Sequence, residues 1–363
     1  MAKRLSSDKT LFAVVLSLVF IGLIMVFSAS AVMAQDRYGT PYTFVLKQII
    51  WALAGLVAMA GIMNLDYRRT RHPAVVFSSL GVTTLLLVAV FFLDRAHNTH
   101  RWIRLGGFSL QPSELAKPAI IIFLAYFLEK RSKRIADWRH TLLPAVLPTI
   151  FLSLLIVAQP DLGTAMVCVA ITAAILFVAG MELKYFGYAV AASLLPLYFL
   201  IFRVPWRYER ILAFINPYSD PQGRGFNIIQ SLIAVGTGGF SGMGLMEGKQ
   251  KLFYLPEPHT DFIFAVTAEE FGLIGSLTVL ALFAIFMFRG LRAAATSRDP
   301  HARYLAVGIT AMVMVQALMN VSVVLALMPT KGIPLPFISY GGSSLFVTMA
   351  TVGMLLNITQ HSD

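Results

Sequence analysis

The sequence contains few charged residues and almost no cysteine. Asp, Glu, Lys and Arg make up 13% of its 363 residues, while hydrophobic residues make up 57%. Soluble domains are about 25% charged and about 45–50% apolar, so an ordinary soluble fold is excluded. The one cysteine, Cys168, has no partner for an internal disulfide, so no disulfide framework supports the fold. We interpret Cys168 as a small core residue.

Sequence signatures of several other chemistries are also missing. The histidines and the cysteine show no metal-ligand spacing, and the serines form no credible hydrolase triad. The glycine-rich run 236–244 fits no dinucleotide fingerprint, and Met243 stands where a P-loop would need its first glycine. We therefore disfavour nucleophilic catalysis and interpret the run as a flexible loop.

Long apolar runs dominate what is present. A helix needs about 20 apolar residues to cross the hydrocarbon core of a bilayer. The first run is longer than the core of a signal peptide, so we expect an uncleaved helix there. We predict an all-α polytopic membrane protein that forms a single domain, 1–363. Its ten candidate spans are roughly 11–34, 44–63, 74–93, 115–128, 142–158, 163–180, 186–202, 262–288, 304–328 and 343–357.

The basic residues predict the orientation of these spans. With the N-terminus in the cytoplasm, 16 of the 29 Lys and Arg residues lie on the inside, as the positive-inside rule requires. Ten spans then place both termini in the cytoplasm. We attribute the net charge of +11 mainly to this topology, and not to nucleic-acid binding. The remaining charge suits an anionic ligand such as a phosphorylated lipid.

Three segments on the predicted outer face carry most of the polar chemistry, namely 94–114, 203–261 and 329–342. The second is a long extracytoplasmic loop between spans seven and eight. Within it, the apolar residues of Phe226–Val235 recur at helical spacing, which predicts an amphipathic helix.

The first motif is RWIRLGGFSLQPSELAK, residues 101–117. Ser113 can cap the following helix, and Glu114 and Lys117 share one helix face at i, i+3. A charge at a membrane boundary is expensive without a partner, so one interpretation is a structural ion pair. The other is a cationic pocket in which Arg101, Arg104 and Lys117 bind a phosphate group.

The second motif is YLPEPHTDFIFAVTAEEFG, which contains His259 and Asp261. Asp261 stands where the long loop enters span eight. It is either an ordinary helix cap or a general base whose pKa is raised by partial desolvation. Glu269 and Glu270 follow about two turns later, inside the span, where carboxylates are candidates for function.

The third motif is PTKGIPLPFISYGGSS, which contains Lys331 and Ser339. Its prolines and glycines interrupt the helix between spans nine and ten. Irregular backbone at membrane depth must be buried in protein or line a wet cavity. The motif is therefore either a packed re-entrant turn or a polar ligand site. Lys47, near the outer end of span two, either reaches the interface or points into such a site.

Together with QPDLGT at residues 159–164, these motifs resemble the SEDS (shape, elongation, division and sporulation) family of peptidoglycan glycosyltransferases. The resemblance runs from the first span to the last. Within the family, the PTKG and DPQGRGFNIIQSL strings resemble the cell-division branch more than the elongation branch. The string AEEFG departs slightly from the family's GEELG but keeps both acids.

The resemblance implies a substrate, a reaction and partners. The substrate is lipid II, an undecaprenyl-pyrophosphate disaccharide-pentapeptide, which is polymerised into a growing glycan chain outside the bacterial cytoplasmic membrane. The partners are a class B penicillin-binding protein, which cross-links the product, and other proteins of the division site. The family's catalytic residue falls on Asp261. The predicted substrate-binding residues are Lys47, Arg101, Arg104, Glu114, Lys117, His259, Lys331 and Ser339.

This chemistry needs a base and positive charge. A positioned carboxylate removes the proton of a sugar hydroxyl, and Lys, Arg or a divalent cation such as Mg²⁺ or Mn²⁺ stabilises the pyrophosphate leaving group. Two alternatives are a lipid II flippase and a scaffold for the penicillin-binding protein. A flippase needs polar features at both faces or the midplane, whereas here they gather outside. A scaffold would tolerate Asp261→Asn.

Overall fold

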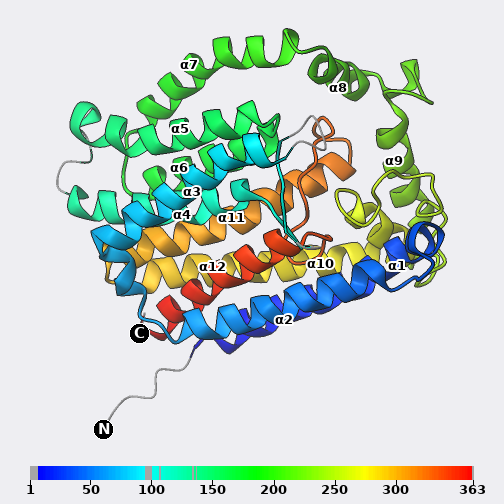
Figure 1. Ribbon diagram of the computed structural model, residues 1–363, viewed down its shortest axis with the longest axis horizontal. Helices are drawn as coiled ribbons and strands as arrows, with labels where there is room; N and C mark the ends of the chain where they lie inside the picture. Colours follow the sequence, from blue (N-terminus) through cyan, green and yellow to red (C-terminus); the bar gives the residue numbers. More distant parts are fainter. Residues whose placement is uncertain (1–6, 95–99, 106–107, 133–134, 136, 362–363) are drawn as a thin grey trace.

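The computed structural model describes residues 7–94, 100–105, 108–132, 135 and 137–361. Gly106 and Gly107 of the first motif lie outside this range. The chain forms a bundle of long helices that run roughly side by side (Figure 1). Ten of them match the ten predicted spans: α1 (Lys9–Tyr38), α2 (Thr43–Met63), α3 (Pro73–Leu93), α4 (Pro112–Lys130), α5 (Leu143–Ala158), α6 (Leu162–Val178), α7 (Leu183–Phe202), α10 (Ile263–Thr296), α11 (Pro300–Val324) and α12 (Gly342–Gln360).

The prediction of a polytopic helical membrane protein is confirmed. Eight helices in the described part of the chain are long and apolar enough to cross a membrane. Of the other two spans, α6 has only 17 residues and α4 contains a charged pair. Both still pack against α11 inside the bundle.

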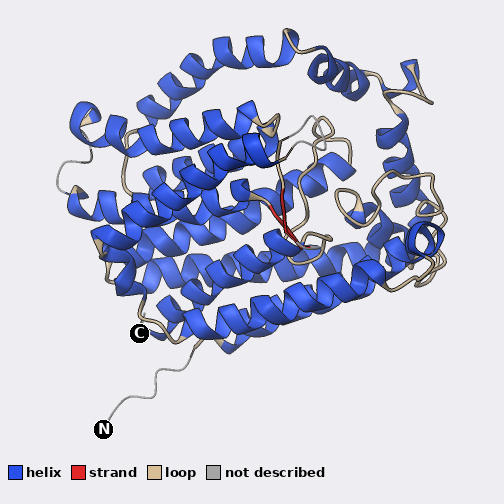
Figure 2. Cartoon of the chain, in the orientation of Figure 1, coloured by secondary structure: helices blue, strands red, loops and turns tan. Residues whose placement is uncertain are grey.

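The segments between the spans contain short elements. The long loop carries α8 (Pro205–Ile215), η4 (Pro217–Ser219) and α9 (Phe226–Gly238), and α9 covers the predicted amphipathic segment. Two strands that the sequence analysis did not predict, β1 (Ile103–Leu105) and β2 (Phe108–Leu110), pair as an antiparallel hairpin (Figure 2). Near the other end of the bundle lie the short helices η1 (Tyr67–Arg71) and η3 (Trp138–Leu142).

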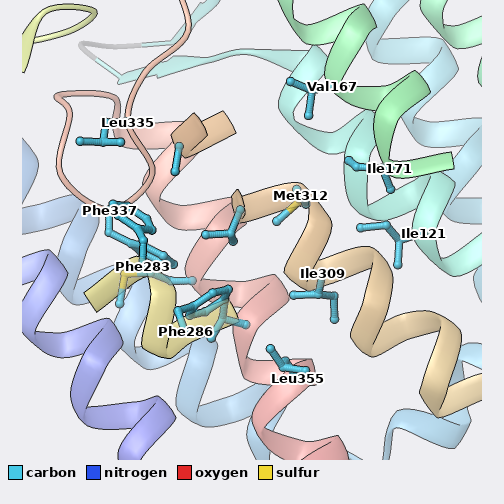
Figure 3. Close-up of a cluster of buried hydrophobic side chains, with 14 of the residues drawn as sticks. Ile121, Val167, Ile171, Phe283, Phe286, Ile309, Met312, Leu335, Phe337 and Leu355 are labelled. Carbon is cyan, nitrogen blue, oxygen red and sulfur yellow. The ribbon is translucent and has the colours of Figure 1, made fainter. Parts of the chain in front are cut away.

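The core lies around α10, α11 and α12. Most residues of α11 and α12 are buried, whereas α7 has no buried residue. Phe283 and Phe286 of α10 meet Ile309 and Met312 of α11 and Leu355 of α12 near the middle of the bundle (Figure 3). The many exposed apolar side chains of the outer helices are expected in a protein whose surrounding solvent is lipid.

Helix α10 is broken at Gly272, which has a φ of 63°. The turn 239–244 packs against this break and exchanges backbone hydrogen bonds with it. Gly242, with a φ of 83°, comes so close that an added Cβ would lie 2.1 Å from the carbonyl oxygen of Glu270. The interpretation of 236–244 as a flexible loop was therefore wrong, because its first residues end α9 and the rest are fastened to α10.

This close approach predicts that Gly242→Ala destabilises the protein. The new Cβ clashes with backbone and forces an L residue into a left-handed conformation, a strain that costs about 1–3 kcal/mol. The midpoint of thermal unfolding in detergent should fall. Gly236→Ala is the matched control, because Gly236 lies in α9 with no neighbour within 4 Å of an added Cβ. It should leave the midpoint unchanged or raise it, and equal midpoints for the two variants would contradict this account.

Candidate active site

A cavity of about 340 Å³ lies where the long loop meets the third motif. Asp261 of the second motif and Lys331 of the third both line it. Most of the other lining residues come from α8, from the turn before α9 and from the start of α9, so the long loop supplies one wall. The cavity is lined by Trp206, Glu209, Arg210, Gly223, Arg224, Asn227, Asp261, Phe262, Thr330, Lys331 and Gly332.

Asp261 is held through its own backbone. The side-chain amide of Asn320 in α11 donates to the carbonyl oxygen of Asp261 and to that of Ile333, both at 2.8 Å. One amide thus joins the entrance of α10 to the third motif. Gly332 faces the carboxylate, and a Cβ at this position would lie 2.9 Å from Oδ2 of Asp261. The glycine therefore lets the loop backbone approach the carboxylate.

The surroundings of Asp261 favour its protonated form. Part of the side chain opens into the cavity, but protein atoms surround the rest densely. This burial, together with the negative charge of Glu257, raises the pKa of Asp261 to about 7. Arg210 and Arg101 act in the opposite direction and stop the pKa from rising further. A carboxylate with such a pKa is well matched to proton transfer near neutral pH.

Positive charge gathers on the walls of the same cavity. Arg210 of α8 donates to the carbonyl oxygen of Thr330 at 3.3 Å, and Arg224 lines the cavity nearby. Burial and the positive charges of Arg210 and Arg207 lower the pKa of Lys331, which shows that these cations act on one another. Guanidinium groups in such a cluster bind phosphate oxygens well.

His259 and Ser339 lie close to Asp261 but outside the cavity lining. The hydroxyl of Ser339 donates to the carbonyl oxygen of Thr260 at 2.5 Å and accepts from the amide of Leu335 at 2.8 Å. His259 is buried, packs on Phe44, and has a pKa lowered by burial to about 4. Neither side chain lines the cavity, so both stabilise the loop next to Asp261. Their role in substrate binding stays a prediction.

Glu114 and Lys117 form the predicted ion pair. Nζ of Lys117 lies 2.7 Å from Oε2 of Glu114, and both side chains are buried. Arg101 donates to the carbonyl oxygens of Gln159 and Pro160, which ties the first motif to the turn before α6. These three residues do not line the cavity, so their part in binding phosphate also stays a prediction.

Two further predicted cations are exposed. Lys47 lies in the first turns of α2, and Arg104 lies on β1. Neither lines the cavity around Asp261. Of the predicted cations, Lys331 alone lines the cavity together with Asp261. The others lie elsewhere on the same end of the bundle.

Sequence reasoning missed the contribution of α8. Trp206, Glu209 and Arg210 line the cavity, yet no helix and no site residue was predicted in the first part of the long loop. A usable signal was present, since the run PWRYERILAFI alternates cations and aromatics with apolar residues at helical spacing. Its position over Asp261 follows from tertiary packing that no local pattern contains.

Glu269 and Glu270, candidates for function from their place inside a span, make structural contacts. Both are buried in α10. Glu269 accepts backbone amides from the loop before Asp261, and Glu270 pairs with Lys251 at 2.6 Å and with Ser28. These carboxylates are fully engaged in holding the long loop to the bundle.

Comparison with known proteins agrees with this arrangement. A family model described as "Cell cycle protein", covering FtsW, RodA and SpoVE, matches residues 8–363. Stage V sporulation protein E of Bacillus subtilis (strain 168) is 43% identical over 361 residues, which are 99% of each chain. A probable peptidoglycan glycosyltransferase FtsW of Geobacter metallireducens is 43% identical over 97% of this chain and 94% of its own length.

Solved structures share the fold. A chain from a structure described as "Structural coordination of polymerization and crosslinking by a peptidoglycan synthase complex" superposes with a TM-score of 0.80 at 31% identity, over 99% of both chains. The rod shape determining protein RodA of Thermus thermophilus gives a TM-score of 0.72 at 26% identity, over 99% of this chain and 98% of its own. Because the family model and these relatives cover nearly the whole chain, this multi-pass bacterial membrane protein belongs to the FtsW/RodA/SpoVE family, the SEDS family that its motifs resemble.

Proposed function

We propose that the chain is a peptidoglycan glycosyltransferase that polymerises lipid II, with Asp261 as its general base. The observation that carries this proposal is the cavity itself, in which a carboxylate with a pKa near 7 lies among fixed positive charges. The names of its relatives, which are probable peptidoglycan glycosyltransferases, support the same reaction.

The reaction follows from these groups. The hydroxyl oxygen of the acceptor sugar attacks the anomeric carbon of the donor sugar, while Asp261 takes the hydroxyl proton. The bond between the anomeric carbon and the pyrophosphate oxygen breaks, and its electron pair leaves with the lipid pyrophosphate. Direct displacement inverts the anomeric centre. Arg210, Arg224 and Lys331 stabilise the negative charge that develops on the leaving group.

A divalent cation stays a prediction. In the described part of the chain, no three carboxylate, imidazole or thiol groups converge on one point. The cavity lining contains two carboxylates, Asp261 and Glu209. Mg²⁺ is commonly held by one or two carboxylates together with substrate phosphates, so this lining suits a cation that binds with the pyrophosphate and neutralises its charge.

The position of the polar groups favours the enzyme over a flippase. The Asp261 cavity lies at one end of the bundle and an ionic cluster of Arg71, Glu129 and Asp299 lies at the other. Apolar side chains such as Phe283, Met312 and Leu355 fill the middle between them (Figure 3). A flippase would need a polar path there. We further infer that the end with the Asp261 cavity faces outward, with both termini in the cytoplasm. The inferred partner is a class B penicillin-binding protein at the division site, consistent with the similarity to a chain of a peptidoglycan synthase complex.

Asp261→Asn should abolish polymerisation while leaving the fold intact. The amide has nearly the same shape but cannot accept the proton, and loss of a general base typically costs about 10²–10⁴-fold in rate. The test supplies lipid II to the purified complex with its transpeptidase and follows glycan polymer on gels. Glu257→Gln, an exposed neighbour, is the control and should keep its activity on the plateau at high pH, where Asp261 is ionised in both chains. Equal polymer from Asp261→Asn and the unmodified chain would reject the base assignment, and an unchanged melting midpoint excludes misfolding.

The rate of polymerisation should rise with pH through the neutral range. Asp261 must be ionised to act as a base, and its pKa is raised to about 7, so activity is low below this value and reaches a plateau above it. Glu257→Gln removes a negative charge that raises this pKa and should shift the rising limb toward lower pH. A limb centred near the ordinary aspartate pKa of about 4, or one that Glu257→Gln moves upward, would contradict the assignment.

Arg210→Gln should weaken catalysis about 10–100-fold, since a hydrogen bond to a charged group contributes about 1.5–3 kcal/mol. The same change removes a positive charge that lowers the pKa of Asp261, so the rising limb of the pH profile should move to higher pH. Arg203→Gln is the matched control, because Arg203 lies in the same loop but does not line the cavity. Similar losses for both variants would show a general effect of charge.

A further inference from the structure

Backbone hydrogen bonds hold the turn 239–244 against α10, about two to three turns after the start of that helix. After the break at Gly272, the amides of Leu273 and Ile274 donate to the carbonyl oxygens of Gly239 and Phe240, at 3.0 and 3.3 Å. Before the break, the carbonyl oxygens of α10 accept the amides of the turn at 3.0 Å. The turn therefore lies beside the body of α10, and Figure 1 shows this stretch of chain close to the ends of α1 and α10.

Two polar pairs between α1 and α10 measure the apolar thickness of the bundle. At one end Arg289 pairs with Asp8 at 2.5 Å, and at the other Ser28 donates to Glu270 at 2.6 Å. The residues between these pairs span about 30 Å on α1 and about 28 Å on α10, at a helical rise of about 1.5 Å per residue. A bilayer has a hydrocarbon core of about 30 Å. Glu270 therefore lies no farther out than the edge of the core on the side of Asp261, because α1 continues with mainly apolar residues from Ala29 to Ala34 beyond Ser28.

The turn reaches past this edge. The carbonyl oxygen of Phe240 accepts a hydrogen bond from the amide of Ile274. Ile274 lies about 6 Å along α10 from Glu270, toward the middle of the membrane. The Phe240 side chain is 71% exposed, and the neighbouring surface of α10 presents Ile274 and Leu277, which are also exposed. Phe240 thus extends the lipid-facing apolar surface of α10. Contact with lipid acyl chains at this depth stabilises the phenyl ring, because it removes apolar surface from water.

The polar groups of the descending chain are satisfied within the protein. Glu269 accepts the amides of Lys249 and Gln250, at 2.8 and 3.2 Å. The ammonium group of Lys251 is buried and contacts both Glu270 and Ser28, at 2.6 and 3.0 Å. Irregular backbone is tolerated at membrane depth only where its hydrogen bonds are made in this way. The two buried carboxylates of α10 thus provide hydrogen-bond partners for polar groups of the loop that would otherwise be unpaired at the membrane.

We propose that residues 239–246 form a re-entrant turn that inserts into the leaflet on the side of the Asp261 cavity, with Phe240 in contact with lipid acyl chains. Leu245 and Met246, both about half exposed, lie nearer the membrane surface. The occupant of this apolar surface is the bilayer itself. The turn anchors the long loop to the membrane plane, and only nine residues separate Lys251 from Asp261. It thereby sets the depth at which the cavity meets its substrate.

Spin-label accessibility tests this depth directly. Phe240→Cys is labelled with a nitroxide in the full chain, reconstituted in phosphatidylcholine and phosphatidylglycerol vesicles, and probed with oxygen and a water-soluble nickel chelate. Native Cys168 is fully buried, and the unsubstituted chain controls for its labelling. Leu277→Cys on α10 is the reference for lipid, and Glu257→Cys is the reference for water.

The label at residue 240 should collide with oxygen more than with nickel, as the label at 277 does, whereas the label at 257 should show the opposite. A nickel-accessible label at 240 would overturn the proposal by placing the turn in water. A label that neither reagent reaches would overturn it by placing the turn against protein. As a second measurement, Phe240→Asp should lower the melting midpoint in vesicles by several degrees relative to Phe240→Leu. Equal midpoints would also refute membrane insertion.

Discussion

The proposed chemistry of this protein depends on the partial desolvation of one carboxylate. Asp261 lies at the edge of an apolar bundle, where protein atoms replace most of its water and raise its pKa to about 7. Desolvation disfavours the charged form, and nearby guanidinium groups limit that effect. The balance yields a group that is ionised often enough to accept a proton and basic enough to hold one. A fully exposed aspartate would be too weak a base at neutral pH.

The fold maintains this balance by fixing Asp261 from several directions. Asn320 joins its backbone to the third motif, Ser339 holds the residue before it, and Gly332 leaves room for the carboxylate. On the other side, α8 brings Arg210 to the same cavity. The carboxylates of α10 hold the loop that leads to Asp261. Several polar side chains of these motifs thus fix the position of Asp261, and their part in binding substrate stays a prediction.

Much of this arrangement could be predicted from the sequence because membranes impose simple rules. Long, mainly apolar runs predicted the ten helices of the bundle, and the i, i+3 spacing predicted the ion pair between Glu114 and Lys117. The place of Asp261 at the entrance of a span predicted a desolvated carboxylate. In each of these cases a local pattern contains the physical cause.

The parts that could not be predicted depend on contacts between distant segments. Arg210 meets Asp261 only because α8 folds back over the bundle, and Glu270 finds Lys251 and Ser28 in two other segments. The glycines of 236–244 look flexible in isolation, yet Gly242 is required for close packing against α10. The sequence predicts on which side of the membrane the charged residues lie. It does not predict which of them line the same cavity.

The central claim is that Asp261 titrates near neutral pH, and infrared difference spectroscopy measures this directly. Chains carrying ¹³C-labelled aspartate would be titrated in vesicles, and the spectrum of Asp261→Asn subtracted from that of the unmodified chain. The account predicts a single carboxyl band that disappears with a midpoint near pH 7. A midpoint near the ordinary aspartate value of about 4 would contradict it.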